Sequence, residues 1–214
     1  CIGAAKFATV IKEISKMSIS LTKGQGISLT KNDGSQLTKV YLGAGWDVAK
    51  AGGGGGFLGK LFGGGSDSID LDASVILLDA NKSKVDVVYF GQLKSRDGSI
   101  RHSGDNLTGA GEGDDEIIYV DLTQIPSHVQ SLVFTISSFR GQTFERIENA
   151  FCRLVDETTR QEIAKYNLSQ KGSYTALIIA KIFRQNGVWQ MQALGETCNG
   201  RTLDEMIPSI LPLV

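Results

Sequence analysis

Residues 105–122 read Asp-Asn-Leu-Thr-Gly-Ala-Gly-Glu-Gly-Asp-Asp-Glu-Ile-Ile-Tyr-Val-Asp-Leu. The first twelve hold five carboxylates, one amide and three glycines, with no lysine or arginine. The last six are typical of a β-strand. Like charges at this density repel, and glycines lose chain entropy when they become ordered. A hard cation offsets both costs, since calcium takes about six to eight oxygen ligands. The segment therefore predicts a calcium-binding loop next to a strand, and a solvated acidic surface loop is the alternative.

The EF-hand is the first calcium motif to compare with this segment. Asp105 and Glu116 fit its first and last positions. Leu107 and Gly109 replace the acids expected at the third and fifth positions, and Ala110 replaces the glycine expected at the sixth. A strand also follows where the motif has its second helix. The segment is not an EF-hand, so a calcium site here needs ligands from a second loop.

A second group of acids occurs in the run Ile69–Asp79. Asp70 and Asp72 alternate with Leu71, which places both carboxylates on one face at the start of a strand. Such a pair either caps a loop in water or chelates a cation.

Short alternating segments with frequent turn signals fill most of the chain, and they predict a β-sandwich or barrel. Asn186-Gly187 between two apolar runs indicates a hairpin. A short helical turn is expected near 142–148, and a C-terminal helix over 202–213, where Thr202 and Glu205 form a capping box and Pro208 limits the helix. Strands are expected at 18–30 (two short ones), 40–46, 69–79, 84–90, 116–122, 131–139, 150–156, 174–184 and 188–194.

Composition narrows the class of protein. The chain has 41% hydrophobic and 21% charged residues, as in an ordinary globular protein. Its net charge of −1 argues against nucleic-acid binding, which needs a basic surface. Three cysteines suit a reducing compartment better than a disulfide framework. No apolar run reaches the length of a transmembrane segment.

Two segments stand apart from the β pattern. Residues 1–16 precede Met17, which resembles a natural start, and they are interpreted as an extension or remnant with amphipathic helical spacing; the leading cysteine also permits a processed lipoprotein. Residues 51–66 form a glycine-rich insert with an apolar tip at 57–62. The rest, 17–214, is expected to be a single domain.

Three motifs together resemble the TerD family of bacterial tellurite-resistance and stress-response proteins. They are Gly43-Ala-Gly-Trp-Asp47, Asp70-Leu-Asp-Ala-Ser74 and the acidic segment from Gly104 to Glu116. The resemblance runs from about residue 17 to about residue 196. It implies a mainly β, two-sheet sandwich that binds calcium, has no established catalytic activity and acts in the cytoplasm. It also implies partners among stress-operon proteins, including a membrane protein, and hence a location that extends to the inner membrane face.

The resemblance assigns the acids to calcium motifs, with Asp47 as an addition. Asp70 and Asp72 then supply the second loop, so the metal is expected between the Asp70/Asp72 loop and the acidic loop 105–116. Five carboxylates plus the Asp70/Asp72 pair are enough for two calcium ions, so two are expected. The candidate ligands are Asp70, Asp72, Asp105, Asn106, Glu112, Asp114, Asp115, Glu116 and Asp47.

Two other classes of function are compatible with a soluble β protein of this composition to different degrees. A calcium-dependent module that docks on a membrane or partner would use the apolar tip 57–62. An enzyme is disfavoured, because His102 and His128 lack zinc-ligand spacing and are expected on the surface or in turns. Cys152 is expected to be buried in a strand, whereas Cys198 is open to exposure.

Overall fold

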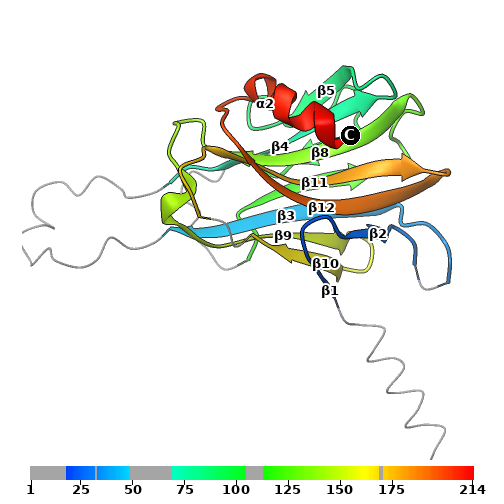
Figure 1. The fold of residues 1–214 in the computed structure, drawn as a ribbon. Coiled ribbons are helices and arrows are strands. Elements are labelled where there is room, and N and C mark those ends of the chain that lie inside the picture. Colours follow the sequence, from blue (N-terminus) through cyan, green and yellow to red (C-terminus); the bar gives the residue numbers. More distant parts are fainter. Residues whose placement is uncertain (1–17, 32, 49–68, 105–112, 169–170) are drawn as a thin grey trace, which may run out of the picture.

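The structure is a computed structural model that describes residues 18–31, 33–48, 69–104, 113–168 and 171–214. These residues form two six-stranded sheets packed face to face, with one helix on the outer side of the second sheet (Figure 1). The predicted mainly β, two-sheet sandwich is confirmed. The extension 1–16 and the insert 51–66 lie outside the described residues.

The strand order brings distant parts of the chain together. Sheet A contains, in spatial order, β1 (Ile19–Leu21), β10 (Gln161–Asn167), β9 (Ile147–Asp156), β3 (Lys39–Val48), β7 (Glu116–Asp121) and β6 (Ile100–His102). Sheet B contains β2 (Gly26–Ser28), β12 (Val188–Cys198), β11 (Ala176–Gln185), β8 (Val129–Ser137), β4 (Asp72–Asp79) and β5 (Lys84–Val88). The two strands expected in 18–30 therefore exist but join different sheets.

The alternation of β3 explains how the sheets pack. Leu42, Ala44 and Trp46 are buried in the main core between the sheets. Strand β4 is buried on both faces: Val75 and Leu77 join that core, while Ile76 and Leu78 join a second cluster with α2 (Leu203–Ile210). A strand covered on both faces reads as a continuous apolar run, as this one does.

The hairpin between β11 and β12 forms where Asn186-Gly187 predicted it. Both residues have positive φ, 52° and 78°, and Gln185 pairs with Val188 across the turn. Two successive left-handed residues match the twist of the flanking strands. The predicted helical turn near 142–148 is a 3₁₀ turn at Phe144–Arg146. Cys152 and Cys198 are both free and buried, and burial raises the pKa of Cys152 to about 12.

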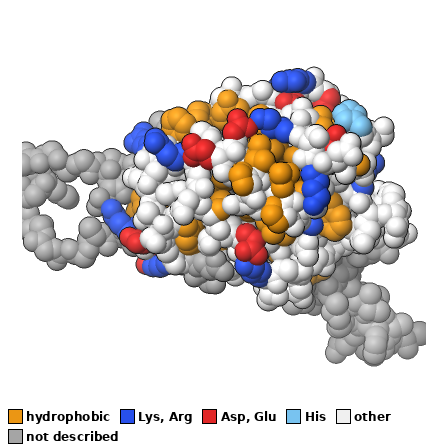
Figure 2. Space-filling view, turned by 45° about the horizontal axis from the view of Figure 1, so that its top comes forward, with side chains coloured by type: hydrophobic (Ala, Val, Ile, Leu, Met, Phe, Trp, Pro, Cys, Tyr) orange, Lys and Arg blue, Asp and Glu red, His pale blue; other side chains and the backbone are white. Residues whose placement is uncertain are grey.

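The C-terminal helix α2 covers the outer face of sheet B, where Figure 2 shows hydrophobic side chains flanked by acidic and basic groups. Thr202 Oγ1 accepts the Glu205 N–H at 3.4 Å, as predicted. The Glu205 carboxylate accepts the backbone N–H of Arg201 (2.7 Å). In a capping box it would accept the N–H of the N-cap residue itself, Thr202, which is one residue later. Pro208 lies inside the helix, which ends at Ile210 and continues as a 3₁₀ turn over Leu211–Leu213.

Removing the Thr202 cap is expected to have a small, measurable effect on stability. Thr202→Ala leaves the Glu205 N–H without its side-chain acceptor and should lower the free energy of unfolding by about 0.5–1 kcal/mol. Urea denaturation monitored by circular dichroism measures the change. Thr202→Ser keeps the hydroxyl and should retain wild-type stability; equal losses in both variants would show that the hydroxyl contributes nothing.

Candidate metal site

The described acids of the predicted site lie where three strands meet at one end of the sandwich. β3 and β7 pair in sheet A, with Ala44 opposite Glu116. The Glu116 side chain crosses to sheet B, where its Oε2 accepts the backbone N–H of Ala73 in β4 (2.6 Å). One hydrogen bond at this end of the sandwich thus joins β7, which follows the acidic segment, to β4, which follows Asp70.

The glycines of Gly43-Ala-Gly-Trp-Asp47 make room for residues 113–115. A Cβ on Gly43 would lie 2.2–2.4 Å from the carboxylate atoms of Asp114. A Cβ on Gly45 would lie 2.7 Å from the carbonyl oxygen of Gly113 and 2.6 Å from the Phe151 ring. The acidic segment therefore ends by packing directly on the backbone of β3, which explains why both outward positions are glycine.

Asp114 is held by an arginine. Arg153 of β9 donates from Nε to Asp114 Oδ1 (2.7 Å) and from Nη2 to Asp114 Oδ2 (2.9 Å), and its Nη1 reaches Glu162 Oε2 at 3.3 Å. The Asp114 side chain is 3% exposed, and this hydrogen-bonded pair raises the pKa of Arg153. A bidentate arginine pair occupies both carboxylate oxygens. In this structure Asp114 anchors the segment instead of facing an open site.

Asp115 and Asp47 line an open hollow of about 700 Å³ together with Asn149 and Asn167. The backbone N–H of Trp46 donates to Asp115 Oδ2 (2.8 Å), and Asn149 Nδ2 donates to Asp47 Oδ2 (2.8 Å). Burial raises the pKa of Asp115; the Trp46 hydrogen bond opposes this rise, and the nearby Asp47, Glu116 and Asp114 carboxylates add to it.

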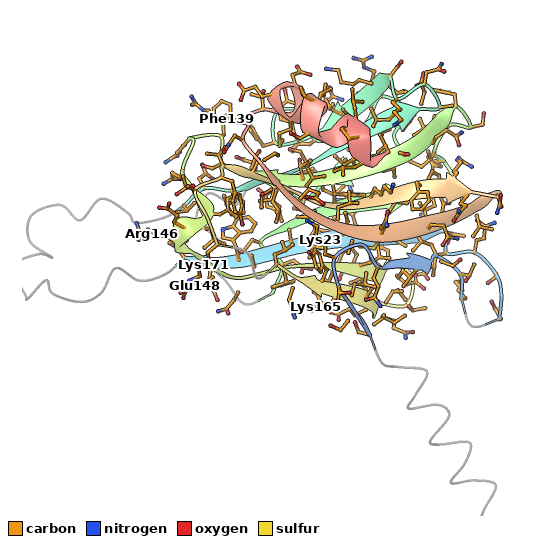
Figure 3. All side chains as sticks on the ribbon, viewed as in Figure 1. Lys23, Phe139, Arg146, Glu148, Lys165 and Lys171 are labelled. Atoms are coloured by element: carbon orange, nitrogen blue, oxygen red, sulfur yellow. The ribbon has the colours of Figure 1, made fainter. Side chains whose placement is uncertain are left out.

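One cation also lines this hollow. Lys165 of β10, labelled in Figure 3, lines it, and its Nζ lies 4.1 Å from the centroid of the Phe151 ring. The hollow is therefore rich in oxygen donors but does not consist only of acids.

Glu116 is fully buried beside a histidine that sequence reasoning placed on the surface or in a turn. That prediction was wrong for His102: it lies in β6, its side chain is fully buried, and its Nε2 is 3.3 Å from Glu116 Oε2. A strand of three residues gives no periodic signal from which its burial could be predicted.

Asp70 and Asp72 do not line the Asp115 hollow. Asp70 pairs with Arg140 (Nε to Oδ2, 3.3 Å) and its N–H donates to Gln142. Asp72 lines a different hollow of about 460 Å³ with Ser74 and Ser137. Because residues two apart on a strand share a face, Asp72 and Ser74 lie on the same face of β4 as Ile76, which packs against α2.

The described residues hold only part of the predicted ligand set. Asp105, Asn106 and Glu112, like the apolar tip 57–62, lie outside the described ranges. Within those ranges, no three acids, histidines or cysteines come together as a metal-ligand group. The donors that line the Asp115 hollow are carboxylates and amides, which are the oxygen ligands that calcium prefers.

Three residues of this end were missed by sequence reasoning: His102, Asn149 and Arg153. Asn149 has a φ of 50°, a left-handed conformation that asparagine tolerates, but an isolated asparagine in a strand gave no signal. Arg153 alternates with buried Cys152 and Leu154, so an outward position was predictable although its partner was not.

Known proteins are similar to this chain in sequence and in fold. A sequence model of the TerD domain matches residues 17–209. The chain is 48% identical over 176 residues to "Tellurium resistance protein TerZ" of Serratia marcescens, covering 82% of this chain and 89% of that protein. It is 46% identical over 198 residues to "Stress response protein SCP2" of Bacillus subtilis (strain 168), covering 89% and 98%.

A solved structure agrees with the architecture. The crystal structure of a homologue of telluride resistance protein (TerD) from Streptomyces coelicolor A3(2) matches with a TM-score of 0.63 over 80% of this chain and 95% of that one. At 18% identity this likeness concerns the fold alone. None of the helices in the described ranges has the length and apolar character of a membrane span.

Proposed function

Because the chain belongs to the TerD family of tellurium-resistance and stress-response proteins, we propose that it acts as a non-enzymatic stress module that binds calcium. The ion is held in the hollow beside Asp47 and Asp115, which residues of β3, β9 and β10 line. The cytoplasmic location and the membrane-protein partner implied by the family resemblance belong to this proposal.

The observation that carries the proposal is the crowding of carboxylates around Asp115. Its carboxyl is partly desolvated, and Asp47, Asp114 and Glu116 all disfavour its ionisation. Arg153 neutralises Asp114, but Asp47 and Asp115 face an open hollow lined by amide groups. A divalent cation bound there supplies the positive charge that removes this repulsion.

Asp47 and Asp115, joined by Asp105, Asn106 and Glu112, are the ligands proposed for this ion. Asp114 and Glu116 hold the end of the segment in place through Arg153 and Ala73. Since Asp72 lines a different hollow, the Asp70/Asp72 pair supports a second ion better than a share in the first.

Calcium is expected to raise the melting temperature of the chelator-treated protein, and magnesium is expected to raise it much less. A ligand that binds only the native state stabilises it by about 2.7 kcal/mol at a concentration one hundred times its Kd. Asp115→Asn removes one charged ligand and should weaken calcium binding at least tenfold by isothermal titration calorimetry, and Asp72→Ala should abolish the weaker of two binding events.

The matched control is Glu157→Gln, which removes an acid just past the far end of β9, where Asp156 pairs with Val40 and not with Asp47. It should bind calcium as the wild type does. A wild-type melting temperature that moves with neither metal would refute calcium binding, and the acidic segment would then be a solvated loop.

A further inference from the structure

The buried imidazole of His102 contacts the residues that flank the acidic segment. Its Nδ1 accepts the backbone N–H of Gly104 (3.0 Å), the residue just before position 105. Its Nε2 lies 3.1 Å from the Ala73 carbonyl oxygen and 3.3 Å from Glu116 Oε2. One side chain therefore links the residue before the segment, the residue at its end and the second residue of strand β4.

These contacts define the tautomer. Because Nδ1 accepts a hydrogen bond from a backbone N–H, it carries no proton in this arrangement. The proton of the neutral ring is then on Nε2, which donates to the Ala73 carbonyl oxygen with the Glu116 carboxyl alongside. The histidine is thus fixed in orientation by a donor on one side and acceptors on the other.

Further hydrogen bonds close the same junction. Ser103 N–H donates to the Ile117 carbonyl oxygen (2.8 Å), and Ile117 N–H donates to Ser103 Oγ (3.0 Å). Glu116 Oε2 accepts the Ala73 N–H, so both backbone groups of Ala73 are engaged by the His102–Glu116 pair. Ala73 lies between Asp72 and Ser74, so the junction also sets the position of the Asp70/Asp72 strand start.

We propose that His102 is a positioning residue of the calcium site: it holds Gly104 and Glu116 at a fixed separation and fixes both to β4. The inference rests on the proposed function and adds a residue that contacts no ion. Groups that orient metal ligands without binding the metal typically contribute about 10–100-fold in affinity. Loss of His102 should therefore weaken calcium binding although every ligand is retained.

The test compares His102→Phe and His102→Gln with Ile100→Ala, all in the full chain. Phenylalanine fills the space of the ring but forms neither hydrogen bond, and glutamine keeps a donor and an acceptor. Ile100 is fully buried on the same strand, so its truncation lowers stability without touching the junction. Calcium affinity is measured by calorimetry well below each melting temperature, and amide hydrogen exchange of Gly104 and Ile117 is measured in calcium-free protein.

His102→Phe is expected to lose exchange protection at Gly104 and to weaken calcium binding about 10–100-fold, with His102→Gln intermediate and Ile100→Ala at wild-type affinity. Wild-type affinity in His102→Phe, or an equal loss in Ile100→Ala, would overturn the positioning role while calcium binding itself stands. If the wild type binds no calcium, the proposed function fails and the positioning role with it. The exchange measurement then still decides whether His102 joins the two chain segments.

Discussion

Gly43→Ala is expected to lower the free energy of unfolding by about 3–5 kcal/mol, because the new methyl group would occupy the position of the Asp114 carboxylate. The steric clash cannot be relieved by a rotamer change of the new side chain, because alanine has no side-chain rotamers. Asp114 must move away, which separates it from Arg153 and lifts residues 113–115 from β3. Denaturant unfolding measures the loss, and calcium titration should show weaker binding in the same variant.

A double-mutant cycle separates this steric effect from a general intolerance of alanine in β3. Asp114→Ala alone costs the ion pair with Arg153, but it also removes the atoms that the methyl of Gly43→Ala would meet. The double variant should therefore be more stable than the sum of the single losses predicts, by at least about 1 kcal/mol. Strict additivity would show that Asp114 does not pack on Gly43.

Glu116→Ala is the second substitution with a large expected effect, a loss of about 3–5 kcal/mol in the free energy of unfolding. It leaves the buried Ala73 N–H without its acceptor and opens a cavity between the sheets. Glu116→Gln retains an acceptor oxygen for Ala73 and should cost markedly less. Thermal and urea unfolding of both variants give the comparison.

An acid outside this junction provides the control for Glu116. Glu148→Ala removes an exposed ion pair with Lys171 and should change stability by no more than about 1 kcal/mol. If Glu116→Ala proved as mild as Glu148→Ala, the bridge between β7 and β4 would not stabilise the sandwich.

The sequence predicts most of the strands and turns because their signals are local, but β6 and β10 were not expected as strands. Alternation in β3, the apolar run of β4 and the Asn186-Gly187 turn each depend on a few consecutive residues. Pairing across the sandwich depends on residues far apart, which explains why β1 and β2 could be expected as strands but not assigned to different sheets.

The candidate site shows the same division between local and distant information. Asp114, Asp115 and Glu116 are consecutive acids, yet they face Arg153, an open hollow and the buried His102 respectively. Composition identifies all three as equivalent oxygen donors. Only the partners supplied by β9, β3 and β6 separate the acids that anchor the segment from Asp115, which lines the hollow.

The short outer strands of both sheets bear on how the protein behaves at high concentration. Among the described strands, sheet A ends at β1 and β6, which have three residues each, and sheet B ends at β2 and β5, which have three and five residues. A short edge offers few unpaired backbone groups to a neighbouring molecule. The short edge strands thereby limit the backbone that is exposed for edge-to-edge pairing between molecules.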